Sequence, residues 1–530
     1  MVTHFFILFG FSTYFQYLFS VPIYPEQKAF LSRKNVCENA EFYAILSLRL
    51  RKKQSASKTY WQREEIMEKR THLDRRLTSG QVAMIGLSGA LGTGLFLGSG
   101  ATIALAGPAT IISYMLAGSL ALAIVWALAE MVSVHPVPGG HGAVAGQYLG
   151  PFGGYIARWN FGIQSFVAVG AEVVASATYL QHWFPNLNLG VGTVLCSVFV
   201  IGLNLATVHL YGTSEYWFSM IKVVAICAFI LLGLSLIFVG WPSPNPPTGL
   251  SNLTTHNGFA PNGLGGILLA ACMAIFSFGG IENASAGAAE SEHPERDIPR
   301  AAGTMIWRLL IFYILAVGVI VTMQPWTETA ESGTIESSPF VKALDQAGVA
   351  AAGHIMNFIL IVAALSAANG CLYASSRMIH SLALDGMAPK FAARTSAQGS
   401  PRAAVVIVSI GMVIASLLAI FAADSAFQYL MGCVILAVLV TWIIVLLTHL
   451  RFRQVRKEQG KPDAPARLWG APVVNYLGIA ACLCVFAVLW WQIHAAWVAG
   501  IPYLILLFGS YFIWRHFHPD YKPQPLPEGH

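Results

Sequence analysis

Twelve long apolar segments, separated by short breaks, constrain this chain more than any other feature of its sequence. Each segment is about 18 to 25 residues long, the length that an α-helix needs to cross the hydrocarbon core of a bilayer. Hydrophobic residues make up 56% of the 530 residues and charged residues 11%, which is far from the balance of soluble proteins. Only helices can satisfy their own backbone in lipid when polar and apolar residues do not alternate. We therefore predict an all-α integral membrane protein with about twelve transmembrane helices, and we exclude soluble, disordered and nucleic-acid-binding classes.

The positive charges of the connections orient these spans, which we number 1 to 12. The predicted spans cover residues 82–104, 109–132, 156–180, 190–211, 217–240, 264–288, 304–324, 347–370, 403–422, 426–448, 473–493 and 497–514. Connections that follow even-numbered spans carry Arg296, Arg300, Lys390, Arg394, Arg402 and six basic residues between 451 and 467, whereas Lys342 stands alone in those that follow odd-numbered spans. By the positive-inside rule, the even connections and both termini are cytoplasmic. We expect a multi-pass protein of the cytoplasmic membrane.

The two ends of the chain differ from the twelve-helix domain, which we place at residues 71–514. Residues 1–70 are first aromatic and apolar, then charged and aperiodic, and they contain no domain-sized core. We expect the functional chain to start near Met67; the alternative is an additional span within residues 1–25. Residues 515–530 would form a short cytoplasmic tail.

Span 1 contains glycine at positions 86, 89, 92, 94, 98 and 100. So many glycines weaken a helix in the middle of the membrane and free backbone N–H and C=O groups, which then require protein or a cavity around them. The alternative is close helix packing through small residues, for example Gly94 and Gly98.

Span 6 contains a second irregularity, in which Gly279 and Gly280 are followed by Glu282 and Asn283. A carboxylate and an amide are costly in lipid and usually mark a functional site. Because spans 1 and 6 occupy the same position in two successive groups of five helices, the pair predicts an inverted repeat with discontinuous helices at a substrate site.

Five strings in this order resemble the amino acid permeases of the amino acid/polyamine/organocation superfamily, most closely their bacterial proton-coupled branch. The strings are GALGTGLFLGSG, RWN with GAEV and YLQHWFP, FSFGGIE with AAESEHPERDIPRA, AALSAANG with YASSRM, and HLRFR. The resemblance extends from about Thr71 to Trp514. It implies a leucine-transporter-like fold with a 5+5 inverted repeat and broken first and sixth helices.

The resemblance also implies which residues bind an amino acid. The backbone N–H groups of Gly92, Thr93 and Gly94 would bind its carboxylate, in agreement with the positive end of a half-helix dipole. Carbonyls of Ala90, Phe276 and Gly279 would bind its ammonium group. Phe276 would also close over the substrate, although a core or lipid-facing position is the alternative.

Three charged residues inside the spans complete the predicted site. By resemblance, Lys222 takes the place of a sodium ion and couples transport to proton entry; the alternative is that it extends to the headgroups. Glu172 and Glu282 match family glutamates, and each requires a partner or a proton. Three roles are open to either glutamate: part of a proton path, orientation of a broken helix by capping freed N–H groups, or contact with the substrate ammonium group. We assign Glu172 to proton coupling and Glu282 to the substrate site, where orientation of the broken helix is the favoured role. Asn283, which departs from the family pattern, would influence which amino acid is bound.

We therefore predict a secondary transporter that imports an amino acid, a neutral L-amino acid by default, in symport with a proton and by alternating access. The rivals are a sodium symporter, an exchanger of the same fold, and a transport-inactive sensor or partner subunit. We expect no enzyme activity, no metal site and no cofactor other than the coupling proton, because no clustered catalytic set, paired CxxC motif or GxxxxGK[ST] motif occurs. The sequence leaves the oligomeric state open.

Overall fold

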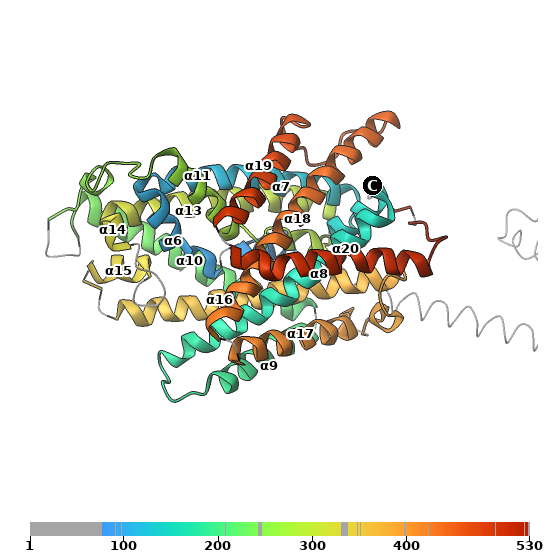
Figure 1. The fold of residues 1–530 in the computed structure, drawn as a ribbon, viewed down its shortest axis with the longest axis horizontal. Coiled ribbons are helices and arrows are strands. Elements are labelled where there is room, and N and C mark those ends of the chain that lie inside the picture. The colour runs from blue at the N-terminus through green and yellow to red at the C-terminus, as the bar shows by residue number, and fades with distance from the viewer. Residues whose placement is uncertain are drawn as a thin grey trace, which may run out of the picture. The chain divides into compact units, whose positions relative to one another are not determined.

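The computed structural model describes residues 77–90, 92–96, 98–206, 208–241, 246–329, 338–346, 348–349, 351–396, 399–421, 423–492, 494–523 and 525–527. Within these ranges the chain is helical, without a named strand, and its helices group into twelve spans (Figure 1). The predictions about residues 1–66 and a start near Met67 lie outside the described residues.

Span 1 consists of three helical pieces and span 6 of two. The helices of the twelve spans, in order, are α4 (Ser79–Ala90), α5 (Thr93–Phe96) and α6 (Gly98–Ala106); α7 (Thr110–Val134); α8 (Gly140–Gln181); α9 (Leu189–Leu205); α10 (Val208–Phe238); α11 (Gly263–Ser277) and α12 (Asn283–Ala286); α13 (Pro294–Met323); α16 (Ala352–Leu384); α17 (Arg402–Phe421); α18 (Ala423–Glu458); α19 (Val473–Gln492); and α20 (His494–Phe517). The connections contain α14 (Trp326–Thr329), α15 (Pro339–Gln346) and the 3-10 helices η3 (Gly107–Ala109), η4 (Ser251–Leu253), η5 (Gly287–Glu290) and η6 (Lys390–Ala393).

Several helices are longer than the apolar segments that predicted them. Helix α10 begins at Val208, whereas its span was predicted from residue 217, and α16 continues to Leu384 beyond the predicted end at 370. The added turns carry polar side chains that are buried against other helices, so a criterion of apolar length does not detect them. Within the described residues, seven helical stretches meet the length and hydropathy of a membrane span, and three shorter helices are apolar.

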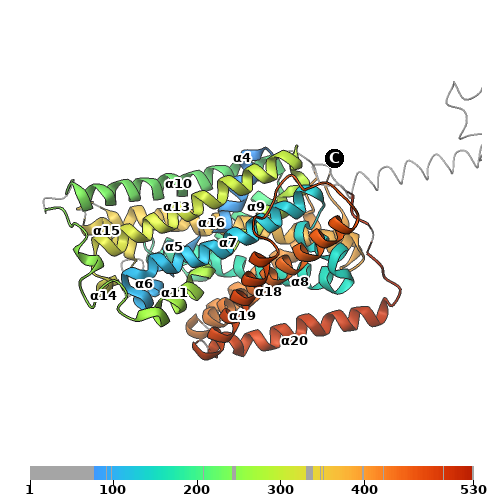
Figure 2. The same cartoon turned by 90° about the horizontal axis from the view of Figure 1, so that it is seen from above.

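The packing of the helices follows an inverted repeat. Each of spans 1 to 4 contacts the span five positions later: α4 contacts α12, α6 contacts α11, α7 contacts α13, α8 contacts α16 and α9 contacts α17. Figure 1 shows α9 beside α17, and Figure 2 shows α7 and α13 extending in the same general direction beside each other. Because span 6 lies five spans after span 1, the chain crosses the membrane in opposite directions in these two spans. The second group of five spans is therefore inverted relative to the first. The predicted 5+5 arrangement with broken spans 1 and 6 is confirmed.

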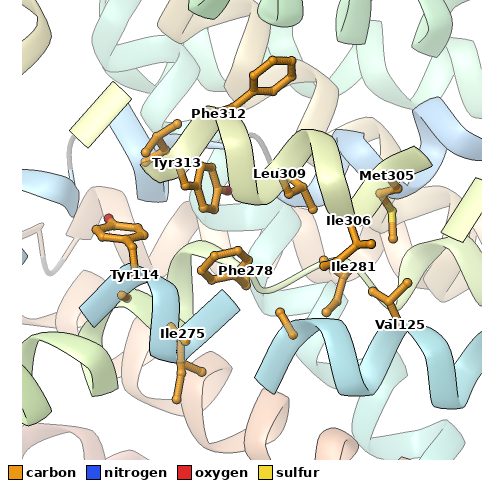
Figure 3. Packing of buried hydrophobic residues seen from close by; sticks show 14 of the residues in the cluster. Tyr114, Val125, Ile275, Phe278, Ile281, Met305, Ile306, Leu309, Phe312 and Tyr313 are labelled. Carbon is orange, nitrogen blue, oxygen red and sulfur yellow. The ribbon is translucent and has the colours of Figure 1, made fainter. Parts of the chain in front are cut away.

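A buried apolar cluster fixes the break of span 6 against spans 2 and 7. Figure 3 shows Phe278 between Tyr114 of α7 and Tyr313 of α13, with ring centroids 6.4 Å and 4.6 Å away. Ile281 also points into this cluster and is fully buried. The break is therefore held in position by its apolar residues, while Gly279 and Gly280 remain free to line a cavity.

Candidate functional site

The two broken spans meet at a contact between two glycines. A Cβ atom placed on Gly89 would lie 2.8 Å from both the Cα and the carbonyl oxygen of Gly280, and one placed on Gly280 would lie 2.7 Å from Cα of Gly89. Gly280 also has a φ of +95°, which favours glycine. Both glycines are thus required by geometry. Gly89 permits the close approach of the two spans, and Gly280 permits both the approach and the turn.

A cavity of about 70 Å³ lies at this junction. Spans 1 and 6 contribute mainly backbone and small residues, and spans 3, 8 and 10 contribute side chains. Its lining consists of Gly89, Gly92, Gly94, Gln164, Ser165, Ala168, Glu172, Ser277, Gly279, Gly280, Asn283, Ala367, Cys371, Val434 and Val438. The cavity combines exposed main chain with few charges, which suits a small zwitterion.

Five of the predicted site residues line this cavity: Gly92, Gly94, Gly279, Asn283 and Glu172. Gly92 occupies the bend after α4, and α5 begins at Thr93, so backbone N–H groups at the start of a half-helix adjoin the cavity. The Ser277 hydroxyl, at the end of α11, donates a 3.1 Å hydrogen bond to the carbonyl of Gly94. This bond connects the two breaks, and Ser277 was not among the predicted residues.

Three predicted residues are described in their backbone alone. Ala90 is the last residue of α4, Thr93 is the first of α5, and Phe276 belongs to the last turn of α11. Their side chains lie outside the described residues, so the prediction that Phe276 closes over the substrate stays a prediction.

Glu282 lies beside the cavity and is absent from its described lining. Its carboxylate is fully buried; one oxygen accepts a 3.1 Å hydrogen bond from the N–H of Gly280, and the other accepts a 3.0 Å bond from Nε2 of Gln164. The carboxylate thus accepts a hydrogen bond from an N–H group at the helix break; the orienting role stays a prediction. Gln164, on α8, was not predicted, although its spacing of eight residues from Glu172 places both on one helix face.

Lys222 is fully buried and does not extend to a membrane surface, which excludes the alternative placement at the headgroups. It lies about 21 Å along α10 from Val208, at 1.5 Å per residue. Its ammonium group donates a 2.9 Å hydrogen bond to the Ser366 hydroxyl of α16. The carboxylates of Glu215 and Glu172 both interact electrostatically with it.

Glu215 is the most important residue that the sequence analysis missed. It is fully buried, and it accepts hydrogen bonds from the Ser366 hydroxyl and, at 2.6 Å, from Nδ2 of Asn369. The predicted span began at residue 217, which placed Glu215 outside the membrane. Its distance of seven residues from Lys222, two helical turns, was the available signal.

Two further carboxylates, Glu130 and Glu290, are buried and paired. Glu130 accepts two 2.7 Å bonds from Arg453 and a 3.0 Å bond with Nε2 of His449. Glu290 pairs with Arg377, with 3.1 Å between Nε and the carboxylate, and also accepts from the Tyr373 hydroxyl. Helix ends that project beyond the apolar segments pack against each other and bury these pairs.

Three histidines near the ends of helices are buried as well: His135, His141 and His380. His141 Nδ1 lies 2.7 Å from the Ser285 hydroxyl, and both ring nitrogens of His135 have partners at 2.9 Å. These side chains have structural hydrogen bonds rather than solvent.

Sequence comparisons relate the chain to known transport proteins. The profile described as Amino acid permease matches residues 81–523. The probable threonine/serine transporter YbxG of Bacillus subtilis is 34% identical over 443 residues, which are 83% of this chain and 95% of that protein. The aromatic amino acid transport protein AroP of Escherichia coli O6:H1 is 36% identical over 406 residues, 76% of this chain and 87% of that protein.

These matches cover the broken spans, the cavity and the buried charges of α10 and α16. They concern transporters rather than enzymes. The chain therefore belongs to the amino acid permease family, whose members are multi-span membrane transporters of amino acids.

Proposed function

We propose that this permease imports a neutral L-amino acid in symport with a proton. The observation that carries the proposal is the buried ammonium group of Lys222, which is hydrogen-bonded to Ser366 and interacts with two carboxylates, one of which lines the cavity between the broken spans.

The substrate would be held mainly by the main chain. N–H groups of Gly92, Thr93 and Gly94 bind its carboxylate, since the start of a half-helix presents unpaired donors and a partial positive charge. Carbonyls near the ends of α4 and α11, at Ala90, Phe276 and Gly279, bind its ammonium group. These groups recognise the part that all amino acids share.

A neutral side chain fits the remaining lining best. Ala168, Ala367, Cys371, Val434 and Val438 offer little polarity, and Glu172 is the charged side chain among the described lining residues. An acidic substrate would require a cationic partner in the cavity. A basic substrate would compete with Lys222 for Glu172. The names of the relatives, which refer to threonine, serine and aromatic amino acids, agree with a neutral substrate.

A proton is the coupling ion that the charges favour over sodium. The ammonium group of Lys222 already supplies a cation at this site, and a second cation nearby would be repelled. Glu172 connects the two functions, because it lines the substrate cavity and interacts with Lys222.

The transport cycle would be alternating access around a fixed site, with spans 1, 2, 6 and 7 moving relative to spans 3, 4, 8 and 9. We place in the cytoplasm the end of the molecule that carries Arg296, Arg394, Arg402, Arg451 and Arg467, called the basic end below, together with both termini. Residues 71–514 would form the transport domain in the plasma membrane, with residues 515–530 as a tail.

Uptake into proteoliposomes tests this function. Purified protein is reconstituted, and accumulation of labelled amino acids is measured under an imposed proton gradient, an imposed sodium gradient or neither, with unlabelled amino acids as competitors. We expect accumulation above equilibrium with an acidic exterior, independent of sodium and inhibited by neutral L-amino acids. Accumulation driven by sodium, or exchange without a response to either gradient, would contradict the proposal.

A further inference from the structure

Two helices present a continuous row of buried polar residues to each other inside the membrane. Helix α10 contributes Tyr211, Glu215, Ser219 and Lys222, and α16 contributes Ser366, Asn369, Tyr373 and Arg377. The spacings of three and four residues place each set on one helix face. We call these eight residues the polar seam. Buried polar groups are costly in a membrane, so a seam of this length requires a function.

The half of the seam farther from the basic end, called the inner half, connects Lys222 to Glu215 through one hydroxyl group. Nζ of Lys222 donates to Oγ of Ser366 at 2.9 Å, and the same hydroxyl donates to Oε1 of Glu215. Nδ2 of Asn369 donates to the other oxygen of Glu215, Oε2, at 2.6 Å. The Ser219 hydroxyl lies 3.5 Å from Oε1 of Glu215 and donates at 3.1 Å to the carbonyl of Met84. Ser366 therefore accepts a hydrogen bond from a proton donor while it donates one to a proton acceptor.

The other half of the seam, called the outer half, extends toward the basic end. Tyr211, one turn before Glu215, stacks on Tyr373 with ring centroids 4.0 Å apart. The Tyr211 hydroxyl is buried and has no hydrogen-bond partner among the described residues. Tyr373 donates to Glu290, and the Arg377 guanidinium lies 3.7 Å above the Tyr373 ring. The pair of Glu290 and Arg377 closes the seam at this end.

We propose that Glu215 receives the transported proton from Lys222 through the Ser366 hydroxyl and releases it along the seam to the basic end. This inference rests on the proposed proton symport. It assigns the proton exit to the interface of α10 and α16, apart from the substrate cavity.

The transfer is balanced by two linked proton movements. One N–H proton of the Lys222 ammonium moves to Oγ of Ser366 as the hydroxyl proton of Ser366 moves to Oε1 of Glu215. The ammonium and the carboxylate become an amine and a carboxylic acid, and the serine is unchanged. When Glu290 and Arg377 separate, loss of the proton from Glu215 to the cytoplasm restores the carboxylate.

The groups around Glu215 permit this exchange. Lys222 and Tyr211 of α10 and Cys371 of α16 interact electrostatically with it. Glu172 of α8 interacts with Lys222 from the cavity side. Lys222 therefore has one carboxylate toward the substrate and one toward the basic end, so its proton can be retained or passed on according to which carboxylate is charged.

The first test replaces Glu215 by glutamine, which has nearly the same size and keeps one acceptor oxygen but cannot take up the transported proton. Full-length Glu215→Gln protein in proteoliposomes is compared with wild type and with Glu292→Gln, a matched change at an exposed carboxylate. Counterflow of labelled amino acid, which requires no net proton movement, and accumulation under a proton gradient are both measured. We expect Glu215→Gln to lower the ratio of accumulation to counterflow at least tenfold and Glu292→Gln to leave it unchanged. Full accumulation by Glu215→Gln would overturn the inference.

The second test concerns the bridging hydroxyl and remains informative if Glu215→Gln fails to fold. Ser366→Ala removes the relay, whereas Ser366→Thr retains a hydroxyl group. We expect amino-acid-induced proton influx, recorded with a trapped pH dye, to fall at least fivefold in Ser366→Ala and to be restored in Ser366→Thr. Equal proton influx in both variants would overturn the relay. Absence of proton influx in the wild type would instead refute the proposed symport, so the two failures are distinguishable.

Discussion

The substrate cavity and the polar seam are two solutions to the problem of polarity inside a membrane. The cavity is formed by breaks in two helices, so main-chain groups of both spans adjoin it, beside the polar side chains of Gln164, Ser165, Glu172, Ser277 and Asn283. The seam is formed by two intact helices, and its polar groups are side chains, two of which bear charge at its inner half. Main-chain groups cannot change their protonation state, whereas side chains can. The difference therefore suggests that recognition and proton coupling depend on separate structures, connected through Glu172 and Lys222.

The largest expected effect comes from the cavity side, at the contact of the two breaks. Gly280→Ala introduces a Cβ within 2.7 Å of Gly89 and a residue with φ of +95°. Strain and overpacking together cost about 4 kcal/mol, or roughly 1,000-fold in the population of the intact site. We expect amino acid uptake by membrane vesicles to be lost at unchanged protein amount. Gly98→Ala, in span 1 but with no atom within 4 Å of the added Cβ, should retain uptake. Equal uptake in the two variants would refute the geometry of the junction.

A smaller effect, on stability, is expected at the outer end of the seam. Glu290→Gln leaves the buried Arg377 without its anionic partner, which typically costs about 3 kcal/mol. We expect a clearly lower melting temperature of the purified protein in detergent. Asp463→Asn, which breaks an exposed pair with Arg467, should change it little. Similar melting temperatures for the two variants would show that the outer seam contributes no stability.

The next smaller effect is expected at Gly92, where Gly92→Ala should weaken substrate binding without disrupting the fold. The added Cβ would make ordinary contacts, at 3.4 Å from the carbonyl oxygen of Gly89 and 3.9 Å from Oε1 of Glu172, but it would occupy part of the cavity. Loss of about one good hydrogen bond corresponds to roughly a tenfold higher KM. Gly318→Ala, in span 7, serves as the control. An unchanged KM would place the substrate away from Gly92.

The smallest effect should be on selectivity. Asn283 lines the cavity with a side-chain amide, 3.9 Å from the sulfur of Cys371. Asn283→Ala removes a group that can hydrogen-bond a substrate side chain, which is worth about 1 kcal/mol. Competition assays should therefore show a change of about fivefold in the ranking of hydroxyl-bearing against purely apolar amino acids. An identical ranking would exclude Asn283 from the side-chain pocket.

The fold was largely predictable because lipid imposes simple rules. Apolar length gave the twelve spans, and the glycines at 92, 94, 279 and 280 marked the breaks, since a weak helix in lipid must adjoin a cavity. The same rule concealed Glu215, because a search for apolar length excludes the polar turns at helix ends. Arg377 and Glu290 were missed for the same reason: their burial depends on partners far away in the chain, which a span-by-span reading does not provide.

The side-chain lining was the least predictable part of the site. Gln164, Ser277 and Ser366 are common polar residues whose importance follows from what they contact across the bundle. Helical spacing could have identified the seam, because Glu215 and Lys222 lie two turns apart on one face. Which helix faces that row, however, is determined by tertiary packing.

The most direct test of the account is whether recognition and coupling separate when Lys222 is neutralised. Lys222→Gln protein is reconstituted, and counterflow and proton-driven accumulation of the same labelled amino acid are measured in one preparation. We predict that counterflow persists within about threefold of wild type, because the main-chain groups proposed to bind the substrate are intact, while proton-driven accumulation is abolished. Retention of proton-driven accumulation at the wild-type level, or parallel loss of both activities in a correctly folded variant, would contradict the account.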